Sequence, residues 1–177
     1  MNLKKAFITA TFGLSFAMPQ AEAALFNFSY TASSGFLAGT LDGILLGDNN
    51  TVVINSILGF ATFNGVPGPS LPVVDSILET FSGAAALPVA SLDGSLMDFC
   101  ASTGAHCVGS VFFFDSSGYL GGTPAMFGTP TIFGNGLETY IAANWSLTPA
   151  GPVPVPATLP LLAIGGAALV ARRRKAA

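Results

Sequence analysis

Residues 25–32 read Leu-Phe-Asn-Phe-Ser-Tyr-Thr-Ala, and this stretch decides the fold class of the chain. Large rings and small polar side chains alternate along it, so that Phe26, Phe28 and Tyr30 share one side. A period of two residues is typical of a β-strand with one buried face and one solvated face. The stretch therefore predicts a strand whose rings point into a hydrophobic core.

Similar short runs, rich in β-branched and aromatic residues, recur outward from this stretch. Helical periodicity is scarce, and only residues 76–86 suggest a helical turn. Dipeptides that favour tight hairpin turns punctuate the runs. The further strand candidates are residues 51–54, 57–63, 73–81, 108–114 and 138–147, and the turn dipeptides are Asp42-Gly43, Asn64-Gly65, Asp93-Gly94 and Asn135-Gly136. This pattern predicts an all-β body over residues 24–151, either a β-sandwich or jelly-roll-like.

Three consecutive rings, Phe112-Phe113-Phe114, stand in one of these runs. Neighbouring side chains in a strand point to opposite faces. The run therefore predicts either a central strand that is buried on both faces or an exposed adhesive ring.

The charges are few and unevenly placed. Only 8% of the 177 residues are charged, against roughly 25% in an ordinary soluble domain. The six basic residues are Lys4, Lys5, Arg172, Arg173, Arg174 and Lys175, and all nine acids lie between these two groups. Nucleic-acid affinity comes mainly from Lys and Arg, and phosphate-transfer sites use them as clamps. The sequence therefore excludes nucleic-acid binding and phosphate-clamping enzymes.

The first 23 residues have the pattern of a secretory signal peptide. Lys4 and Lys5 precede an apolar stretch at residues 6–18, and Ala21-Glu22-Ala23 forms a cleavage site. Thirteen residues of helix span about 20 Å, which is short of a hydrocarbon core of about 30 Å. We therefore expect passage through the Sec translocon and cleavage by signal peptidase after Ala23, in preference to a permanent N-terminal anchor.

The other end of the sequence combines three features in a fixed order. Alternating prolines at residues 151–157 favour an extended backbone. An apolar stretch at residues 158–171 follows, and then come Arg172, Arg173, Arg174 and Lys175. Basic residues after an apolar segment stay on the cytoplasmic side. We expect a short transmembrane helix that stops in the membrane with the body outside.

This tripartite tail at residues 152–177 resembles the PEP-CTERM class of bacterial sorting signals. The segment Val153-Pro154-Val155-Pro156-Ala157 resembles the VPLPA variant of that class, with Val155 in place of Leu and without a Pro-Glu-Pro. The resemblance implies recognition by an exosortase, a membrane-embedded cysteine peptidase or transpeptidase that cuts near the motif. It also implies a transient stay in the inner membrane, followed by release to the cell surface or the extracellular matrix. A plain single-span anchor is the alternative.

The two cysteines, Cys100 and Cys107, flank six residues that include the single histidine, His106. In an exported chain such a pair is typical of one disulfide. The alternative is a metal or redox pair with His106 as third ligand, although zinc sites need three or four ligands at defined spacing.

Candidate catalytic and ligand residues are sparse. A hydrolase would have to use His106, and Asp93 with Asp98, which are five residues apart, are the candidate carboxylates for a glycosidase pair. Scattered oxygens from Asp42, Asp48, Asn49 and Asn50 could hold a structural Ca²⁺, but they lack the alternating acids of an EF-hand. We expect no catalytic residues, no metal and no cofactor.

The leading functional expectation is a non-enzymatic protein of the bacterial surface or extracellular matrix. A first alternative is a carbohydrate-binding body that retains exopolysaccharide, which requires Trp145 or Tyr140 to lie exposed beside Asn or Asp. A second is a secreted hydrolase that uses His106. A third is a subunit whose edge strands pair between copies.

Overall fold

The computed structural model describes residues 23–133 and 136–151. Most of the predicted signal peptide, including Ala21, therefore lies outside the described residues, as do the sorting motif at residues 153–157 and the basic cluster at residues 172–175. Within the described ranges, no helix is long and apolar enough to cross a membrane.

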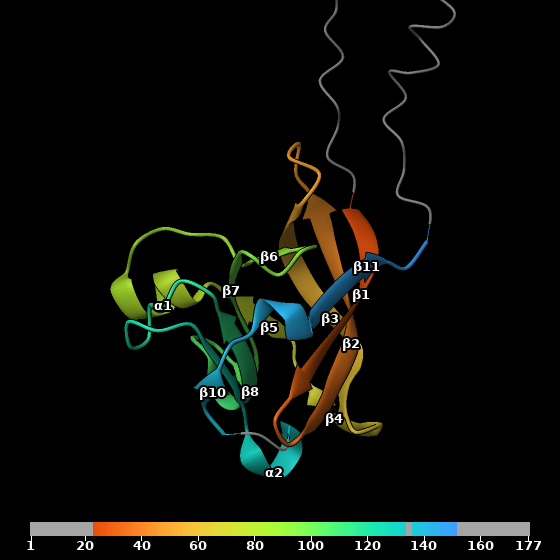
Figure 1. Cartoon of the computed structure of the whole chain (residues 1–177), viewed down its shortest axis with the longest axis vertical. Helices are drawn as coiled ribbons and strands as arrows, with labels where there is room; N and C mark the ends of the chain where they lie inside the picture. The colour runs from red at the N-terminus through yellow and green to blue at the C-terminus, as the bar shows by residue number, and fades with distance from the viewer. Residues whose placement is uncertain (1–22, 134–135, 152–177) are drawn as a thin grey trace, which may run out of the picture. The chain divides into compact units, whose positions relative to one another are not determined.

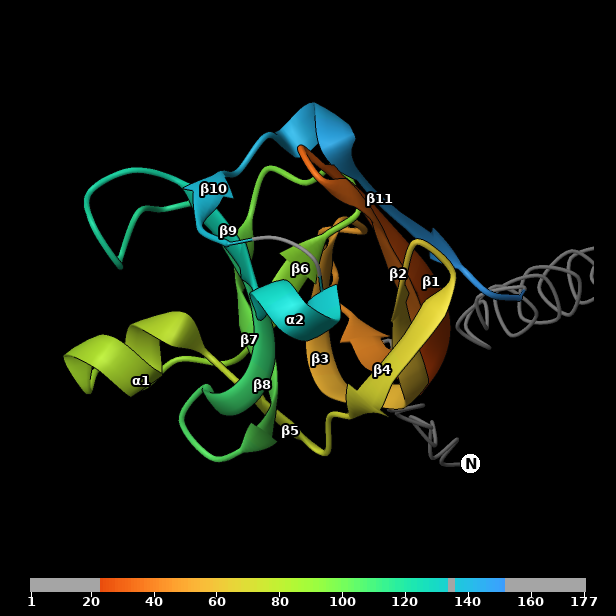
Figure 2. The same cartoon turned by 90° about the horizontal axis from the view of Figure 1, so that it is seen from below.

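The body is one antiparallel β-sheet that curls around its own core (Figure 1). The strand order along the sheet is β10-β9-β8-β7-β6-β3-β2-β1-β11, with β4 paired to β3 and β5 paired to β7. Seen from below, β1, β2 and β3 lie on one side of the interior, and β7, β8 and β9 lie on the other (Figure 2). The all-β expectation is confirmed; a sandwich or jelly roll is not confirmed, because these strands form a single curled sheet.

The strands are β1 (Ala23–Ala32), β2 (Gly35–Leu45), β3 (Thr51–Phe63), β4 (Val66–Ser70), β5 (Val73–Asp75), β6 (Val89–Ser91), β7 (Met97–Gly104), β8 (Val108–Asp115), β9 (Ala125–Gly128), β10 (Glu138–Thr139) and β11 (Trp145–Pro149). The helical elements are α1 (Ile77–Ser82), α2 (Pro130–Phe133) and the 3₁₀ turn η1 (Ala142–Asn144).

Strand β1 confirms the prediction made from residues 25–32. The rings of Phe26, Phe28 and Tyr30 are buried in the core, and β1 pairs with β2 on one side and β11 on the other.

Strand β2 was not predicted, because its glycines suggested turns. Asp42-Gly43 lies inside β2, at a bulge in its pairing with β3, so the predicted hairpin turn is wrong. A Cβ at Gly43 would approach Val52 Cγ1 to within 2.5 Å, and one at Gly39 would approach the ring of Phe28 to within 2.7 Å. The side chain of Val52 and the ring of Phe28 fill the space that a side chain at Gly43 or Gly39 would need. Glycine therefore fits at these two positions of the strand.

Other predicted elements are partly corrected. The candidate strand at residues 73–81 is β5 followed by α1, because the Ser76 side chain caps the helix by accepting a hydrogen bond from the Glu79 N–H. Residues 51–54 and 57–63 form one strand, β3, with a positive φ at Gly59. Residues 138–147 comprise β10, η1 and the start of β11.

Two turn dipeptides fall between strands as predicted. Asn64-Gly65 joins β3 to β4 with positive φ at both residues, as a type I′ turn requires. Asp93-Gly94 lies between β6 and β7, but only its glycine has a positive φ. Asn135 lies outside the described residues.

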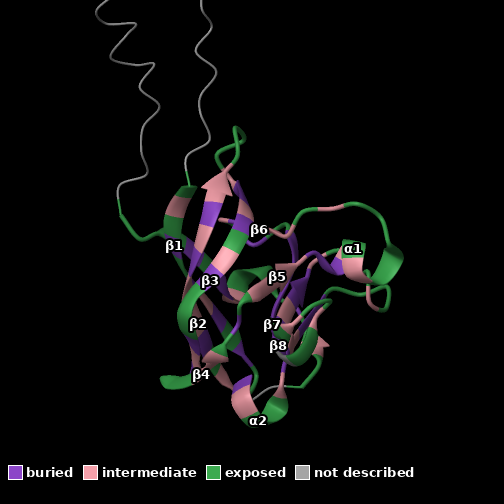
Figure 3. Ribbon diagram, turned by 180° about the vertical axis from the view of Figure 1, so that it is seen from behind, coloured by how far each residue is buried: buried purple, intermediate pink, exposed green. Residues whose placement is uncertain are grey.

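The core is an aromatic cluster that both halves of the sheet share. Phe28 lies 5.8 Å from Phe112, between ring centroids, and Tyr30 lies 5.1 Å from Phe114. Buried positions run along the strands, while the loop beyond α1 is largely exposed (Figure 3).

A second, smaller cluster lies on the opposite face of β7 and β8. It contains Ile77, Cys100 and Val111, and Phe113 packs against it while stacking on Phe127. Strand β8 therefore buries apolar side chains on both faces, as the first interpretation of Phe112-Phe113-Phe114 predicted.

Buried carboxylates organise two loops without any cation. Asp98 accepts hydrogen bonds from the Ser76 hydroxyl and from the Ile77 and Leu78 N–H groups at the start of α1. Asp115 is fully buried, and it accepts three N–H groups, from Ser117, Gly118 and Leu120. No buried side-chain N or O atom in the described part of the chain lacks a partner.

Replacing Asp115 tests how much this loop anchor stabilises the body. Asp115→Asn should lower the free energy of unfolding by about 2–3 kcal/mol. The Asn side chain replaces one acceptor oxygen by an NH₂ group, and this donor would then face a backbone N–H donor. Urea unfolding checks this value. Asp42→Asn is the matched control, since Asp42 bonds the Asn55 side chain on the exposed face. Equal losses of unfolding free energy in the two variants would contradict this stabilising role of Asp115.

Candidate functional site

The open side of the curled sheet is closed by the chain that joins its two edge strands. Strands β10 and β11 end the strand order, and residues 140–144 connect them. Three hydrogen bonds fasten β10 and this connection to β1 and the turn that follows it. Ser33 N–H donates to Glu138 Oε2 (3.0 Å), Ile141 N–H to the Tyr30 hydroxyl (3.1 Å) and Asn144 Nδ2 to the Thr31 carbonyl (2.8 Å).

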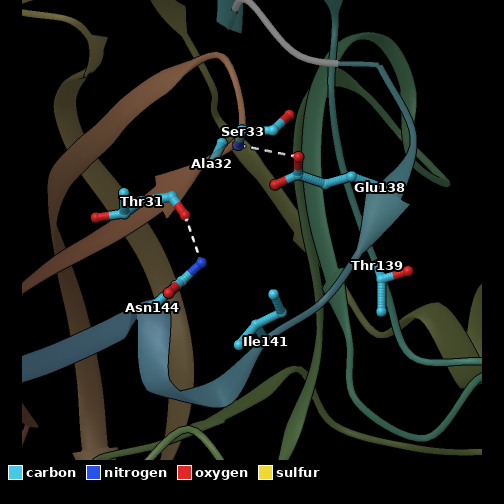
Figure 4. Close-up of a pocket in the computed structure, with 7 residues that line it drawn as sticks. All are labelled: Thr31, Ala32, Ser33, Glu138, Thr139, Ile141 and Asn144. Atoms are coloured by element: carbon cyan, nitrogen blue, oxygen red, sulfur yellow. Dashed lines mark hydrogen bonds between the residues drawn. The ribbon is translucent and has the colours of Figure 1, made fainter.

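A pocket of about 320 Å³ lies at this closure (Figure 4). Its lining residues are Thr31, Ala32, Ser33, Glu138, Thr139, Ile141 and Asn144. The volume is at the lower end of the range for small-molecule sites. Glu138 supplies the carboxylate of this lining, so the pocket offers acceptors and hydroxyls to a ligand that donates hydrogen bonds.

The sugar-binding alternative required an exposed Trp145 or Tyr140, and the structure buries both. Trp145 is 7% exposed and Tyr140 is 6% exposed. The Trp145 indole donates to the Ser91 carbonyl (2.9 Å), and the Tyr140 hydroxyl donates to the Gly94 carbonyl (2.8 Å). Neither ring can offer a face to a sugar, so carbohydrate binding through these rings is wrong.

His106 lies in the hairpin that the disulfide closes. Cys100 and Cys107 are bonded, with their Cα atoms 5.7 Å apart, which confirms the predicted disulfide over a metal or redox pair. His106 and Cys107 both have positive φ at the hairpin turn, and the His106 N–H donates to Asp75 Oδ2 (2.7 Å). The imidazole is thus placed on an exposed turn.

The structure gives Asp93 and Asp98 separate local roles. Asp93 is exposed, and hydrogen bonds from the Ser95 N–H and hydroxyl hold the pKa of its carboxyl well below the usual value. Asp98 is buried against α1. The two carboxylates therefore belong to different hydrogen-bonded groups.

The candidate calcium oxygens are likewise used in different places. Asp42 lies in β2, whereas Asp48 lies in the β2–β3 turn and accepts from the Thr51 hydroxyl and N–H. These bonds, the hydroxyl first, lower the pKa of Asp48. Among the residues that the structure describes, no group of three or more His, Cys, Asp or Glu side chains is placed to hold a metal ion.

Sequence reasoning did not identify the pocket at the closure. Ser33 and Glu138 are 105 residues apart, and neither stands in a recognisable motif. Only the curl of the sheet brings the end of β1 to β10.

The buried tyrosines at the closure predict alkaline destabilisation. Burial raises the pKa of Tyr140 and of Tyr30 above their usual value of 10.0. The neighbouring Tyr30 and then Asp93 add to the rise in the pKa of Tyr140, and Glu138 adds to the rise in the pKa of Tyr30. The unfolded chain therefore ionises first, so stability is complete below pH 10 and falls above it. Chemical unfolding between pH 8 and about 11.5 measures this loss.

Tyr140→Phe should reduce the loss at high pH, while costing about 1 kcal/mol at neutral pH through the bond to Gly94. Tyr119→Phe, on an exposed ring, controls for removal of a hydroxyl. An unchanged alkaline slope in Tyr140→Phe would contradict this role of Tyr140.

Comparison with known proteins identifies the tail but not the body. No curated protein and no solved structure matches the chain. A family model described as the PEP-CTERM protein-sorting motif matches residues 152–175, although the sequence contains no Pro-Glu-Pro. The chain thus carries a PEP-CTERM protein-sorting motif at residues 152–175, and this motif implies export and exosortase-type delivery to the cell surface or extracellular space.

Proposed function

We propose that the chain is a non-enzymatic structural protein of the bacterial cell surface or extracellular matrix. The single observation that carries this proposal is the sorting motif at residues 152–175, which directly follows the last described residue of the folded body, Gly151. The motif supplies the destination, and the β-body is what is delivered.

The contacts of the body support a structural role. The carboxylates that sequence reasoning considered for catalysis, Asp93 and Asp98, serve a turn and a helix start. The Cys100–Cys107 disulfide suits an oxidising compartment outside the cytosol. Residues 24–151 contain acids but neither Lys nor Arg, so a net negative charge favours solubility after release.

The processing steps that we propose follow the two signals. Signal peptidase cuts after Ala23, which is the first residue of β1, so that the mature chain begins at Ala24. The helix at residues 158–171 then holds the chain in the inner membrane, with Arg172, Arg173, Arg174 and Lys175 on the cytoplasmic side. An exosortase-type peptidase reads Val153-Pro154-Val155-Pro156-Ala157 and frees the body.

Intact-mass spectrometry of the native protein tests this sequence of steps. The form in the medium or on the cell surface should begin at Ala24 and end within residues 153–157. Replacing Pro154 and Pro156 by Ala should leave the tail uncut, because it removes both prolines of the motif that the peptidase is proposed to read. A chain that remains intact to Ala177 in the inner membrane would instead support a plain anchor.

Activity assays separate the structural role from the hydrolase alternative. The purified body should show no turnover of ester, peptide or glycoside substrates. A turnover that disappears in His106→Ala, while the body stays folded, would overturn the non-enzymatic assignment. Because the His106 backbone N–H, and not its ring, bonds Asp75, this substitution retains that contact.

A further inference from the structure

The pocket at the closure of the sheet is not used by the proposed structural role. One wall comes from the end of β1 and the turn after it, and the other from the segment that starts at β10 (Figure 4). The bonds from Ser33 N–H to Glu138 Oε2 and from Asn144 Nδ2 to the Thr31 carbonyl join these walls. The pocket is therefore already formed in the folded body, and a ligand would bind without ordering a loop first.

A carboxylate and an aliphatic side chain face the same space in this pocket. Figure 4 shows the Glu138 carboxylate and the Ile141 side chain extending toward this space from opposite sides. Glu138 is half-buried, and the bond from the Ser33 N–H holds one of its oxygens in place. Ile141 is 50% exposed. This arrangement suits a ligand with a positive charge on a carbon skeleton, because the charge meets the carboxylate and the carbon atoms cover the isoleucine.

The charge of the body favours a cation at this position. Residues 24–151 contain acids but neither Lys nor Arg, so their summed field attracts cations. Burial raises the pKa of Tyr30, and the charge of Glu138 adds to this rise. The Tyr30 hydroxyl accepts from the Ile141 N–H at 3.1 Å, beside the pocket. The charge of Glu138 is therefore only partly screened by water here, and a cation bound beside it would gain from this field.

A primary ammonium group fits these residues better than a metal ion or a guanidinium group. Ca²⁺ requires about six to eight oxygen ligands, and in the described part of the chain no three His, Cys, Asp or Glu side chains are grouped to hold a metal. A guanidinium pairs best with both oxygens of a carboxylate, but Glu138 Oε2 already accepts the Ser33 N–H. An ammonium group is a compact point charge that can bind through a single oxygen.

We propose that this pocket binds a primary ammonium group on a slim aliphatic chain, with the nitrogen at the Glu138 carboxylate and the carbon atoms against Ile141. A free aliphatic amine and a lysine side chain of another protein present the same chemistry. A second copy of the body supplies no such side chain, because residues 24–151 contain no Lys. This binding does not depend on the proposed surface role.

Isothermal titration calorimetry of the full chain in a mild detergent, with butylamine as the probe, tests the proposal. At neutral pH and low salt the dissociation constant should be on the order of 1 mM, which about five non-hydrogen atoms of ligand can supply. Butanol has nearly the same shape without the charge, and it should bind at least about tenfold more weakly. Added salt should weaken the binding of butylamine, because it screens the charges.

Three variants locate the site. Glu138→Gln keeps an acceptor oxygen for the Ser33 N–H but removes the charge, and it should weaken butylamine binding at least about tenfold. Glu79→Gln is the matched control, because it removes one exposed charge on α1 and leaves the pocket unchanged. Its dissociation constant should stay within about twofold of the wild type. Ile141→Ala should weaken binding about threefold, because apolar contact is lost. Emission from Trp145, the single and buried tryptophan, checks that each variant is folded.

A lysine derivative distinguishes the two sources of the ammonium group. N-acetyl-lysine methylamide carries the same four-carbon amine on a peptide backbone. If it binds at least as tightly as butylamine, the ligand is assigned to a lysine of a partner protein. If it binds more weakly, because the backbone does not fit at the pocket mouth, the ligand is assigned to a free amine.

Four results would overturn the proposal. The first is no binding of butylamine at about ten times the expected dissociation constant, and the second is butanol binding as tightly as butylamine. The third is wild-type affinity in a folded Glu138→Gln variant, or an equal loss in Glu79→Gln, since the general field of the body would then explain the binding. The fourth is tighter binding of butylguanidine than of butylamine, which would replace the ammonium group by a guanidinium group.

Discussion

The structure depends on aromatic packing that closes the curled sheet. The two edge strands are consecutive in the chain, so the segment between them must bridge the open side of the curl. Tyr140 stacks on Tyr30 with a centroid distance of 5.6 Å, and Trp145 meets Phe114 at 5.1 Å. Buried rings contribute large apolar areas and prefer stacked or edge-on contacts. These contacts bind the C-terminal segment of the body to β1 and β8, and they thereby determine where the sorting tail departs.

A body without Lys or Arg must satisfy its buried carboxylates in another way. Asp98 and Asp115 lie opposite each other on β7 and β8, and each accepts hydrogen bonds from backbone N–H groups. In an ordinary domain a buried carboxylate often pairs with Lys or Arg. Here backbone N–H groups, held in place by the fold, donate the hydrogen bonds that a buried carboxylate requires. The acids thus order loops and a helix start, which is why the carboxylates that seemed suited to catalysis are found in local structural roles.

Destination and architecture are carried by separate parts of the chain. A sorting signal can be joined to many bodies, so it specifies where a protein goes without specifying a fold. The body contributes the geometry of attachment, because β1 and β11 place both ends of the folded unit at one end of the sheet. The pocket between Ser33 and Asn144 lies at the opposite end of this strand pair.

The sequence by itself determined the elements whose signals are local. The alternation at residues 25–32, the Asn64-Gly65 turn and the Cys100–Cys107 pair were readable because period, turn chemistry and short spacing need no distant partner. The sorting motif was readable for the same reason. Only the tertiary structure decided that Gly39 and Gly43 belong to a strand, that Trp145 and Tyr140 are buried, and that Glu138 meets Ser33. These features depend on how the sheet curls, and the curl is set by packing between segments more than 100 residues apart.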